Sequence, residues 1–445
     1  MNAGPSRQDG RSPLARILAN TAWLLGGKGF GAVCGIAYLA ILTRSLGLKD
    51  FGHFSLIFGT AQALIAIAGF ETWRVVVRYG AQYVHAQDWD RFGRLGILCG
   101  LIDAVGAVLG CGVAFTVIYG FSDALDLNPR YIDTAFWFCC AMLWALVSAP
   151  TGIVRALHRF DRAVYVEAVV PLGRLIAALT IWWAGPSVAR FLMAWAVIDL
   201  IEGALYWAMA RRLCPQALRL SHLRDWRLAF RENPGLVRFF LVTHAGGSID
   251  AVTRQGPLLA VGGLIGTRAA GLYRLAGQLT QALGKLSSLL TRSVYAEVAH
   301  VRAASGAAAF RRLAVQTSLL AATAGTILSL LAHFLGADLL VLIGGEGFRK
   351  GEGILIPLAI AASFELASVA FEPVLHSTDR AGSALLARVV GMLVLLAAIP
   401  VLVGIGAAGI AWAVALGSAT SYLALGGLAW HRLRADDFGA AAAAG

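Results

Sequence analysis

The strongest constraint on the fold is a series of long apolar segments separated by short polar ones. A helix that crosses a lipid bilayer needs about 20 mostly apolar residues. Twelve segments meet this requirement, and charged residues make up only 14% of the chain, well below the roughly 25% usual in soluble domains. The expected spans are 16–44, 52–78, 94–121, 134–158, 164–185, 188–212, 239–265, 271–292, 313–335, 353–376, 385–405 and 408–433. We therefore predict an all-α integral membrane protein with about 12 transmembrane helices.

A short glycine motif occurs twice, each time between two apolar segments. In each copy two glycines lie five positions apart, and an aromatic residue follows two positions later. The glycines are Gly47 and Gly52 in the first copy, and Gly266 and Gly271 in the second, 219 positions further on. Glycine readily adopts the backbone angles of a tight turn between helices. A repeat at about half of the chain length predicts two related six-helix lobes, although paired glycines also occur in unrelated membrane hairpins.

Basic residues are distributed unequally between the two sides of the predicted helices. Lys and Arg accumulate in the cytoplasmic loops of membrane proteins. If the N-terminus is cytoplasmic, the loops on its side carry about three times as many Lys and Arg residues as the opposite loops. We therefore predict that both termini are cytoplasmic. The net charge of +12 is then explained by membrane topology and requires no nucleic-acid partner.

The apolar segments and the basic stretch between them divide the chain into five parts. We expect a disordered cytoplasmic N-terminus (1–15), an N-terminal lobe (16–212), a basic cytoplasmic connector (213–238), a C-terminal lobe (239–433) and a cytoplasmic tail (434–445). In the connector, apolar residues recur at helical spacing among arginines. The connector is therefore either an amphipathic segment on the membrane surface or a simple tether.

Basic residues inside the predicted spans are the first candidates for a binding site. Ionisable side chains at bilayer depth cost several kcal/mol, so they usually face a protein interior or a water-filled cavity. The candidates are Lys28, Arg74, Arg78, Arg254 and Lys285. If the two lobes face each other, these cations can line a shared cavity that suits an anionic substrate such as a phosphate or diphosphate. Alternatively, Arg78 snorkels to the interface, and Arg74 and Arg254 form ion pairs on their own helices.

Acidic residues inside the spans are candidates for coupling transport to an ion gradient. Asp199 and Glu202 lie three positions apart in the sixth span, and Asp250 lies in the seventh. Such carboxylates can bind a coupling cation or relay protons. The alternative, which we favour for Asp199 and Glu202, is a structural ion pair with Arg174 of the fifth span.

The sequence gives little support for catalysis or metal binding. It contains no phosphate-binding loop, no His-Glu-x-x-His, no Gly-x-Ser-x-Gly and no paired cysteine motif. Its six cysteines have no metal-ligand spacing, and we expect them to be small buried packing residues. We therefore expect no catalytic residue, no metal site and no cofactor.

Several short stretches resemble a known transporter family. They are Asn20–Trp23, Leu42–Gly47, Phe51–Phe54 and Arg78–Gly80 in the first half, and Ile265–Tyr273 and Gly345–Pro357 in the second. Together they resemble polysaccharide (O-antigen-type) flippases of the multidrug/oligosaccharidyl-lipid/polysaccharide (MOP) superfamily. One departure concerns the seventh span, where the family often has an acidic–basic pair and this chain has Gln255, Gly256 and Pro257.

The resemblance implies a V-shaped bundle that works by alternating access. It also implies a polyprenyl-diphosphate-linked oligosaccharide as substrate, moved from the inner to the outer leaflet of a bacterial inner membrane for O-antigen, lipopolysaccharide or exopolysaccharide synthesis. Partners would be membrane lipids and other polysaccharide assembly proteins. The main alternative is a cation-coupled multidrug antiporter of the same superfamily, whose cavity would favour acidic groups. A membrane enzyme and a non-transporting scaffold are the remaining alternatives.

Overall fold

The computed structural model describes residues 13–300, 307–368, 371 and 381–443, and all regular elements within these residues are helices. The first half of the chain forms α1 (Pro13–Ala68), α2 (Thr72–His85), α3 (Trp89–Gly120), α4 (Ile132–Trp144), α5 (Ser148–Ala156), α6 (Phe160–Glu167), α7 (Val169–Ala184) and α8 (Val188–Leu213). The second half forms α10 (Leu236–Leu264), α11 (Thr267–His300), α12 (Ala307–Gly344), α13 (Glu352–Ser368), α15 (Ala381–Leu402) and α16 (Ala407–Ala443). Short helical turns η1 (Asp123–Leu125), η2 (Pro129–Tyr131), η3 (Leu220–Leu223), η4 (Glu346–Gly351) and η5 (Val403–Ile405), and the short helix α9 (Leu228–Glu232), connect them.

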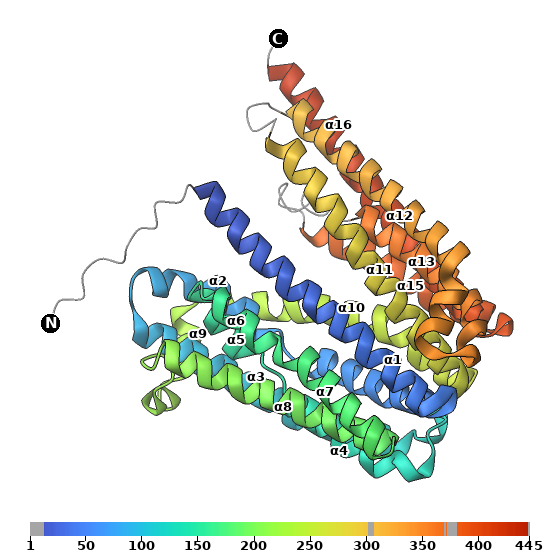
Figure 1. The fold of residues 1–445 in the computed structure, drawn as a ribbon. Helices are drawn as coiled ribbons and strands as arrows, with labels where there is room; N and C mark the ends of the chain where they lie inside the picture. The colour runs from blue at the N-terminus through green and yellow to red at the C-terminus, as the bar shows by residue number, and fades with distance from the viewer. Residues whose placement is uncertain (1–12, 301–306, 369–370, 372–380, 444–445) are drawn as a thin grey trace.

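The helices form two lobes arranged as a V (Figure 1). The lobes diverge at the end where α1 begins and α16 ends, which we call the open end, and they meet at the opposite, closed end. Helix α10 packs against α1 and α2 of the first lobe and against α11, α15 and α16 of the second. The predicted all-α, two-lobed, V-shaped membrane bundle is therefore confirmed.

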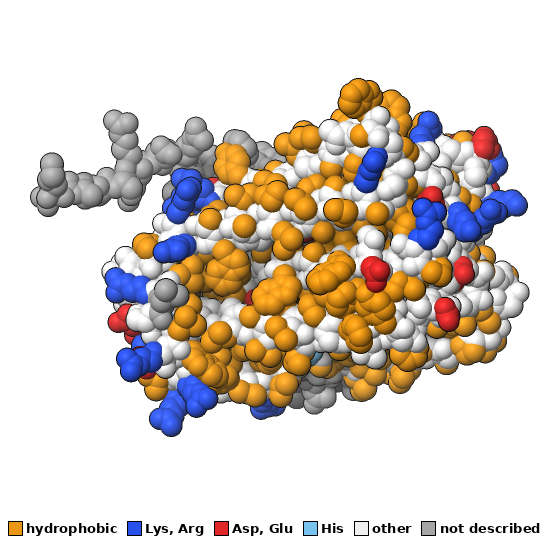
Figure 2. Space-filling view, turned by 90° about the horizontal axis from the view of Figure 1, so that it is seen from below, with side chains coloured by type: hydrophobic (Ala, Val, Ile, Leu, Met, Phe, Trp, Pro, Cys, Tyr) orange, Lys and Arg blue, Asp and Glu red, His pale blue; other side chains and the backbone are white. Residues whose placement is uncertain are grey.

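Most predicted spans correspond to a single helix or to a pair of consecutive helices, and α1 runs through the first span and into the second. Residues 369–370 and 372–376 of the tenth span lie outside the described residues. Among the described residues, eight segments are long and apolar enough to cross a membrane. Figure 2 shows apolar side chains over the middle of one face, with Lys and Arg concentrated towards its ends. Large apolar residues such as Trp137 and Trp183 are exposed, as expected for helices in contact with lipid.

Three predicted spans of the first lobe are each divided into two helices. The second span is interrupted between α1 and α2, the fourth between α4 and α5, and the fifth between α6 and α7. Pro150 and Pro171 each lie in the first turn after an interruption. Proline has no N–H to donate to the preceding turn, but it is tolerated at the start of a helix. The sequence therefore permits a helix to begin anew near the middle of the fourth span and near the start of the fifth.

The repeated glycine motifs meet at the closed end. Gly47 (φ 71°) and Gly266 (φ 118°) have the positive φ of tight turns. Gly52 is helical, and a Cβ placed on it would lie 2.0 Å from the carbonyl oxygen of Thr267. A Cβ on Gly271 would lie 2.9 Å from the carbonyl oxygen of Leu48. The first glycine of each motif thus makes the turn, whereas the second lets the two lobes approach closely.

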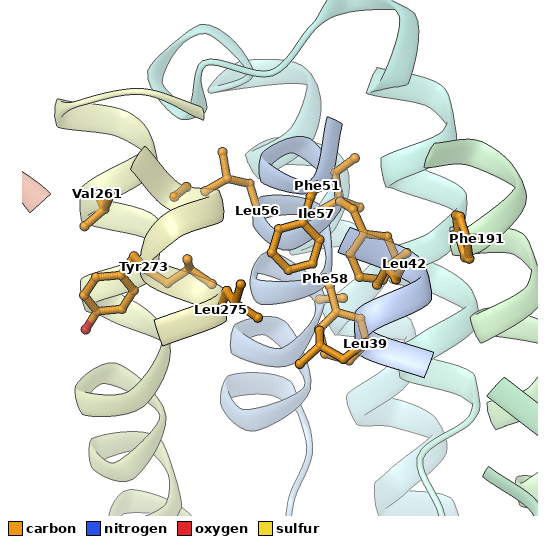
Figure 3. Close-up of a cluster of buried hydrophobic side chains, with 14 of the residues drawn as sticks. Leu39, Leu42, Phe51, Leu56, Ile57, Phe58, Phe191, Val261, Tyr273 and Leu275 are labelled. Carbon is orange, nitrogen blue, oxygen red and sulfur yellow. The ribbon is translucent and has the colours of Figure 1, made fainter. Parts of the chain in front are cut away.

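The described residues contain two large hydrophobic cores. The first lies towards the closed end and includes residues of both lobes, among them Leu42, Phe51 and Ile57 of α1 and Val261 and Leu275 of the second half (Figure 3). The second lies towards the open end, within the first lobe, and includes Val76, Phe92, Ile153, Tyr206 and Leu236. The closed end is thus joined by a core that both lobes share.

The connector between the lobes is packed onto the first lobe. Its short elements η3 and α9 contact α3, and Ala229 is fully buried. Nε of Arg94 donates to the carboxylate of Glu232 at 3.2 Å, and the hydroxyl of Tyr83 donates to Oδ1 of Asn233 at 2.9 Å. The connector therefore belongs structurally to the first lobe and is not a free tether.

Candidate functional site

Helix α2, near the open end, carries two of the predicted cavity cations. Nε of Arg74 forms an ion pair with Glu71 at 2.8 Å, and its guanidinium lies 5.2 Å from the centre of the Trp73 ring. The guanidinium of Arg78 lies 4.4 Å from the centre of the Phe239 ring of α10. Both arginine side chains are exposed. Arg74 is thus partly neutralised, whereas Arg78 has an aromatic neighbour and keeps its hydrogen-bond donors accessible.

Arg155 of α5 joins this group, although the sequence pattern pointed to no role for it. Its guanidinium lies 4.6 Å from the centre of the Trp73 ring. Two arginines from two different helices, Arg74 and Arg155, therefore approach one indole ring. Pro150 could have revealed this position, because a break in the fourth span places Arg155 on a separate short helix.

A second pair of arginines meets deeper in the molecule, between the lobes. Arg174 of α7 and Arg274 of α11 lie 5.7 and 5.2 Å from the centre of the Phe58 ring. Nη2 of Arg174 donates to both carboxylate oxygens of Asp199, at 2.9 and 2.8 Å. Among the described residues, Arg274 takes part in no ion pair, and its guanidinium faces the side-chain amide of Gln278.

These contacts decide between alternatives for the acidic residues. Asp199 is paired with Arg174, as favoured from the sequence, and both side chains are largely buried. Glu202, for which the same pairing was favoured, lies one turn along α8 with its side chain partly buried, and it forms no ion pair with a described residue. Arg274 was overlooked, although it meets the criterion that selected Lys285, a charged residue inside the predicted eighth span. Side chains at Lys28 and Lys285 lie outside the described part of the structure.

The second lobe contains a cavity of about 280 Å³ whose lining includes several charged groups. Three helices supply its charged groups: Asp250 and Arg254 come from α10, Glu365 from α13 and Arg388 from α15. Nη1 of Arg388 donates to the two carboxylate oxygens of Asp250 at 3.1 and 3.3 Å. Asp250 therefore pairs with a distant helix. Arg254 lines this cavity in the second lobe and does not lie among the arginines near Trp73.

Comparisons with known proteins agree with this architecture. A family model described as "Polysaccharide biosynthesis protein" matches residues 17–295, more than half of the chain. The chain is 27% identical over 344 residues to inner membrane protein YghQ of Escherichia coli strain K12, covering 76% of this chain and 95% of the relative.

Two solved structures have a similar fold. An inward-facing multidrug resistance MATE family transporter of the MOP superfamily superposes with a TM-score of 0.67 at 12% identity, covering 91% of this chain and 95% of its own. The lipid II flippase MurJ, in an inward closed conformation, gives a TM-score of 0.65 at 8% identity, covering 90% and 85%. At these identities the likeness concerns the fold. Because the family model covers most of the first lobe and continues into the second, the chain belongs to the polysaccharide biosynthesis protein family.

Proposed function

We propose that this protein is a flippase that moves a polyprenyl-diphosphate-linked oligosaccharide from the inner to the outer leaflet of a bacterial inner membrane. The observation that carries the proposal is the group of arginines at the open end, Arg74, Arg78 and Arg155, around Trp73 and Phe239. A guanidinium offers several donors in a planar fork that matches the oxygens of a phosphate or diphosphate. The fold shared with a lipid II flippase supports a lipid-linked substrate.

The proposed direction depends on membrane topology. The excess of Lys and Arg in the loops near the termini favours a cytoplasmic location for both ends of the chain. The open end then faces the cytoplasm, and the substrate enters from the inner leaflet. The diphosphate would contact the arginines while the polyprenyl chain stays in the bilayer.

The alternative of a multidrug antiporter has less support from the charges. Asp199 and Asp250, two of the acidic groups that could attract a cationic drug, already face the guanidinium groups of Arg174 and Arg388. A coupling cation at either position would have to displace an arginine. Glu202 is the predicted coupling residue that appears in none of the ion pairs between described residues, so we assign it the proton-relay role.

Direct binding tests the substrate class. The full-length protein in nanodiscs is titrated with polyprenyl diphosphate, polyprenyl monophosphate and polyprenol of equal chain length. We expect the diphosphate to bind at least about tenfold more tightly than the alcohol, a difference of about 1.4 kcal/mol. Equal affinities would refute the proposal, because the arginines would then contribute nothing to recognition.

A deletion strain tests the transport role. Loss of the gene should cause a complete polyprenyl-diphosphate oligosaccharide to accumulate and a surface polysaccharide to disappear, as measured by mass analysis of extracted lipids. Orientation is read from a reporter fused after Gly445, which should give a cytoplasmic signal. An outer-face signal would reverse the proposed direction.

A further inference from the structure

Two helices of the first lobe begin at one buried carboxylate, that of Asp103 on α3. Asp103 is only 7% exposed. The hydroxyl of Thr72, the first residue of α2, donates to the two carboxylate oxygens at 2.8 and 3.0 Å. The backbone amide of Ala149, in the first turn of α5, donates to Oδ2 at 2.8 Å. One side chain of a third helix therefore caps α5 through a backbone amide and holds the first residue of α2 through its hydroxyl, and both helices start after breaks in their spans.

Further contacts join α2 directly to α5. The backbone amide of Trp73 donates to the hydroxyl of Ser148 at 3.0 Å. A Cβ placed on Gly152 would lie 2.8 Å from both Cα of Trp73 and Cβ of Val76. The two helices thus touch at the distance of their backbones, and Arg155 of α5 reaches over Trp73 of α2.

This pair of helices belongs to a different core from the helices that precede it. Val75 and Val76 of α2 and Ile153 of α5 lie in the core near the open end. Leu64 of α1 and Met142 of α4, just before the two breaks, lie in the core near the closed end. On the continuous helix α3, Asp103 lies between Cys99, which belongs to the core near the open end, and Ala107, which belongs to the core near the closed end. The two breaks and Asp103 therefore mark a boundary inside the first lobe.

The electrostatics of this boundary explain why an uncompensated carboxylate is tolerated there. The N-terminus of a helix carries a partial positive charge and unpaired N–H groups. In other transporters, such half-helix ends inside the membrane face an anionic ligand. Asp103 forms no ion pair with a described Lys or Arg. The chain's own carboxyl group thus lies at the starts of two helices, where it accepts from the backbone of α5 and from the side chain of Thr72 of α2.

The paired helices also contact α10, which leads into the second lobe. The ring of Phe70, at the break before α2, lies 5.0 Å from that of Phe240 and 4.7 Å from that of His244. Arg78 of α2 lies over Phe239. Towards its other end, α10 carries Asp250 and Arg254, which line the cavity of the second lobe. A shift of α10 would therefore act directly on α2.

We propose that Asp103 is a positioning residue that joins α2 and α5 into one rigid element. This element carries Arg74, Arg78 and Arg155 and turns as a unit about the breaks at 69–71 and 145–147 when the lobes rearrange. The rigid-element claim concerns motion alone, whereas the role of its arginines in substrate capture rests on the function proposed above.

The first test measures distances without any substrate, so that it is independent of the proposed function. Spin labels are placed at Gln82 of α2 and Thr151 of α5, within the element, and at Gln82 and Val113 of α3, across the boundary, in full-length protein in nanodiscs with its native cysteines replaced. We expect a narrow distribution for the first pair and a broader one for the second. Equal widths for the two pairs would overturn the proposal.

Variants then identify the role of the carboxylate. Asp103→Ala should widen the distribution within the element by about twofold or more, as expected when a local packing unit opens, and formate should narrow it again. Asp103→Asn keeps the shape of the side chain, and we expect it to have a smaller effect in the same direction. Asp88→Asn is the matched control, because Asp88 caps the start of α3 by accepting from the amide of Arg91. Unchanged widths in both Asp103 variants, or equal widening in Asp88→Asn, would refute the assignment.

A second measurement tests whether the position of the α2–α5 element affects the affinity for polyprenyl diphosphate. Asp103→Ala should weaken binding of polyprenyl diphosphate by about tenfold, comparable to the loss of one charge-assisted contact, and Asp88→Asn should not. If the wild-type protein binds no diphosphate, the proposed function fails while the distance measurements still decide whether the element exists. Wild-type affinity in an Asp103→Ala protein with a widened distribution would refute the positioning role.

Discussion

The closed and open ends of the molecule hold their helices together in different ways. At the closed end the two lobes share one hydrophobic core and approach to backbone distance at Gly52 and Gly271. The carbonyl oxygens of Ile343 and Leu342, at the end of α12, accept from the hydroxyl of Thr43 at 3.0 Å and from Nη2 of Arg44 at 2.7 Å. These bonds satisfy carbonyl groups that the last turn of a helix leaves free.

At the open end, contacts to α10 depend on aromatic rings and arginines. Arg78 and Tyr79 of α2 contact the ring of Phe239, and Phe70 contacts Phe240. Such contacts tolerate shifts of side chains, because stacking is favourable over a range of geometries. The difference indicates that steric fit determines the closed end, whereas adaptable side-chain contacts hold the open end, as the proposed capture of a charged ligand requires.

The largest effect on stability is expected from Gly52→Ala, which disrupts the close packing of the two lobes at the closed end. The new Cβ would lie 2.0 Å from the carbonyl oxygen of Thr267, a backbone atom that can yield only if the lobes separate. Overpacking of this kind costs about 1–3 kcal/mol. We expect a lower melting temperature and less folded protein in the membrane.

Gly112→Ala is the control for this substitution. Gly112 also lies in a helix and is exposed, and a Cβ added to it would have no neighbouring atom within 4 Å. Alanine has the higher helix propensity by about 1 kcal/mol, so this variant should be neutral or slightly more stable. Equal loss of folded protein in both variants would show that helix packing at Gly52 has no special importance.

The glycines also show how far the sequence could predict the structure. The repeat predicted two lobes with matching turns, and the positive φ angles of Gly47 and Gly266 are a local property that a sequence pattern can reveal. The role of Gly52 is different, because it depends on Thr267 of the other lobe. A contact between residues that far apart cannot be derived from local spacing.

The candidate site was harder to predict for the same reason. Spacing on one helix suggested Arg254 as a partner of Asp250, but the carboxylate pairs with Arg388, 138 positions away. Hydropathy alone treated the fourth span, 134–158, as one continuous helix, and Arg155 near its end was not selected as a candidate. The ion pair between Asp199 and Arg174 was easier to predict, because spans that are neighbours in the sequence are usually neighbours in space.

A smaller effect on folding, but a clear one on binding, is expected from Arg78→Ala at the open end. The side chain is exposed and forms no ion pair with a described residue, so its loss should change stability little. We expect about tenfold weaker binding of polyprenyl diphosphate, or about 1.4 kcal/mol. Titration in nanodiscs measures this affinity.

Arg130→Ala provides the matched control, because Arg130 is an exposed arginine in the loop between α3 and α4, at the closed end. Its removal should leave diphosphate affinity unchanged. If both variants lose affinity equally, general attraction by the positive net charge accounts for binding, and the distinction between the two ends does not extend to the ligand.

The smallest effect is expected from pH at the closed end. Asp126, in the loop between α3 and α4 and outside the membrane-spanning segments, accepts from the backbone amide of Thr267 at 2.9 Å. Hydrogen bonds from the hydroxyl and the amide of Thr267 lower the pKa of the Asp126 carboxyl. A lowered pKa in the folded state means that this contact stabilises the closed end above the usual Asp pKa of about 3.9. The stabilisation is lost as the pH falls through the lowered value.

We therefore expect the distance between labels on the two lobes at the closed end to increase in wild-type protein below about pH 4, with a small fall in melting temperature. Asp126→Asn removes the titrating group but keeps an oxygen that can accept from Thr267. In this variant, titration at position 126 should therefore not change the distance between the labels over that pH range. A wild-type profile that coincides with that of Asp126→Asn would show that the glycine contacts and the shared core hold the closed end without this carboxylate. The steric account of that end would then be complete, and the contrast with the arginine-lined open end would be sharper.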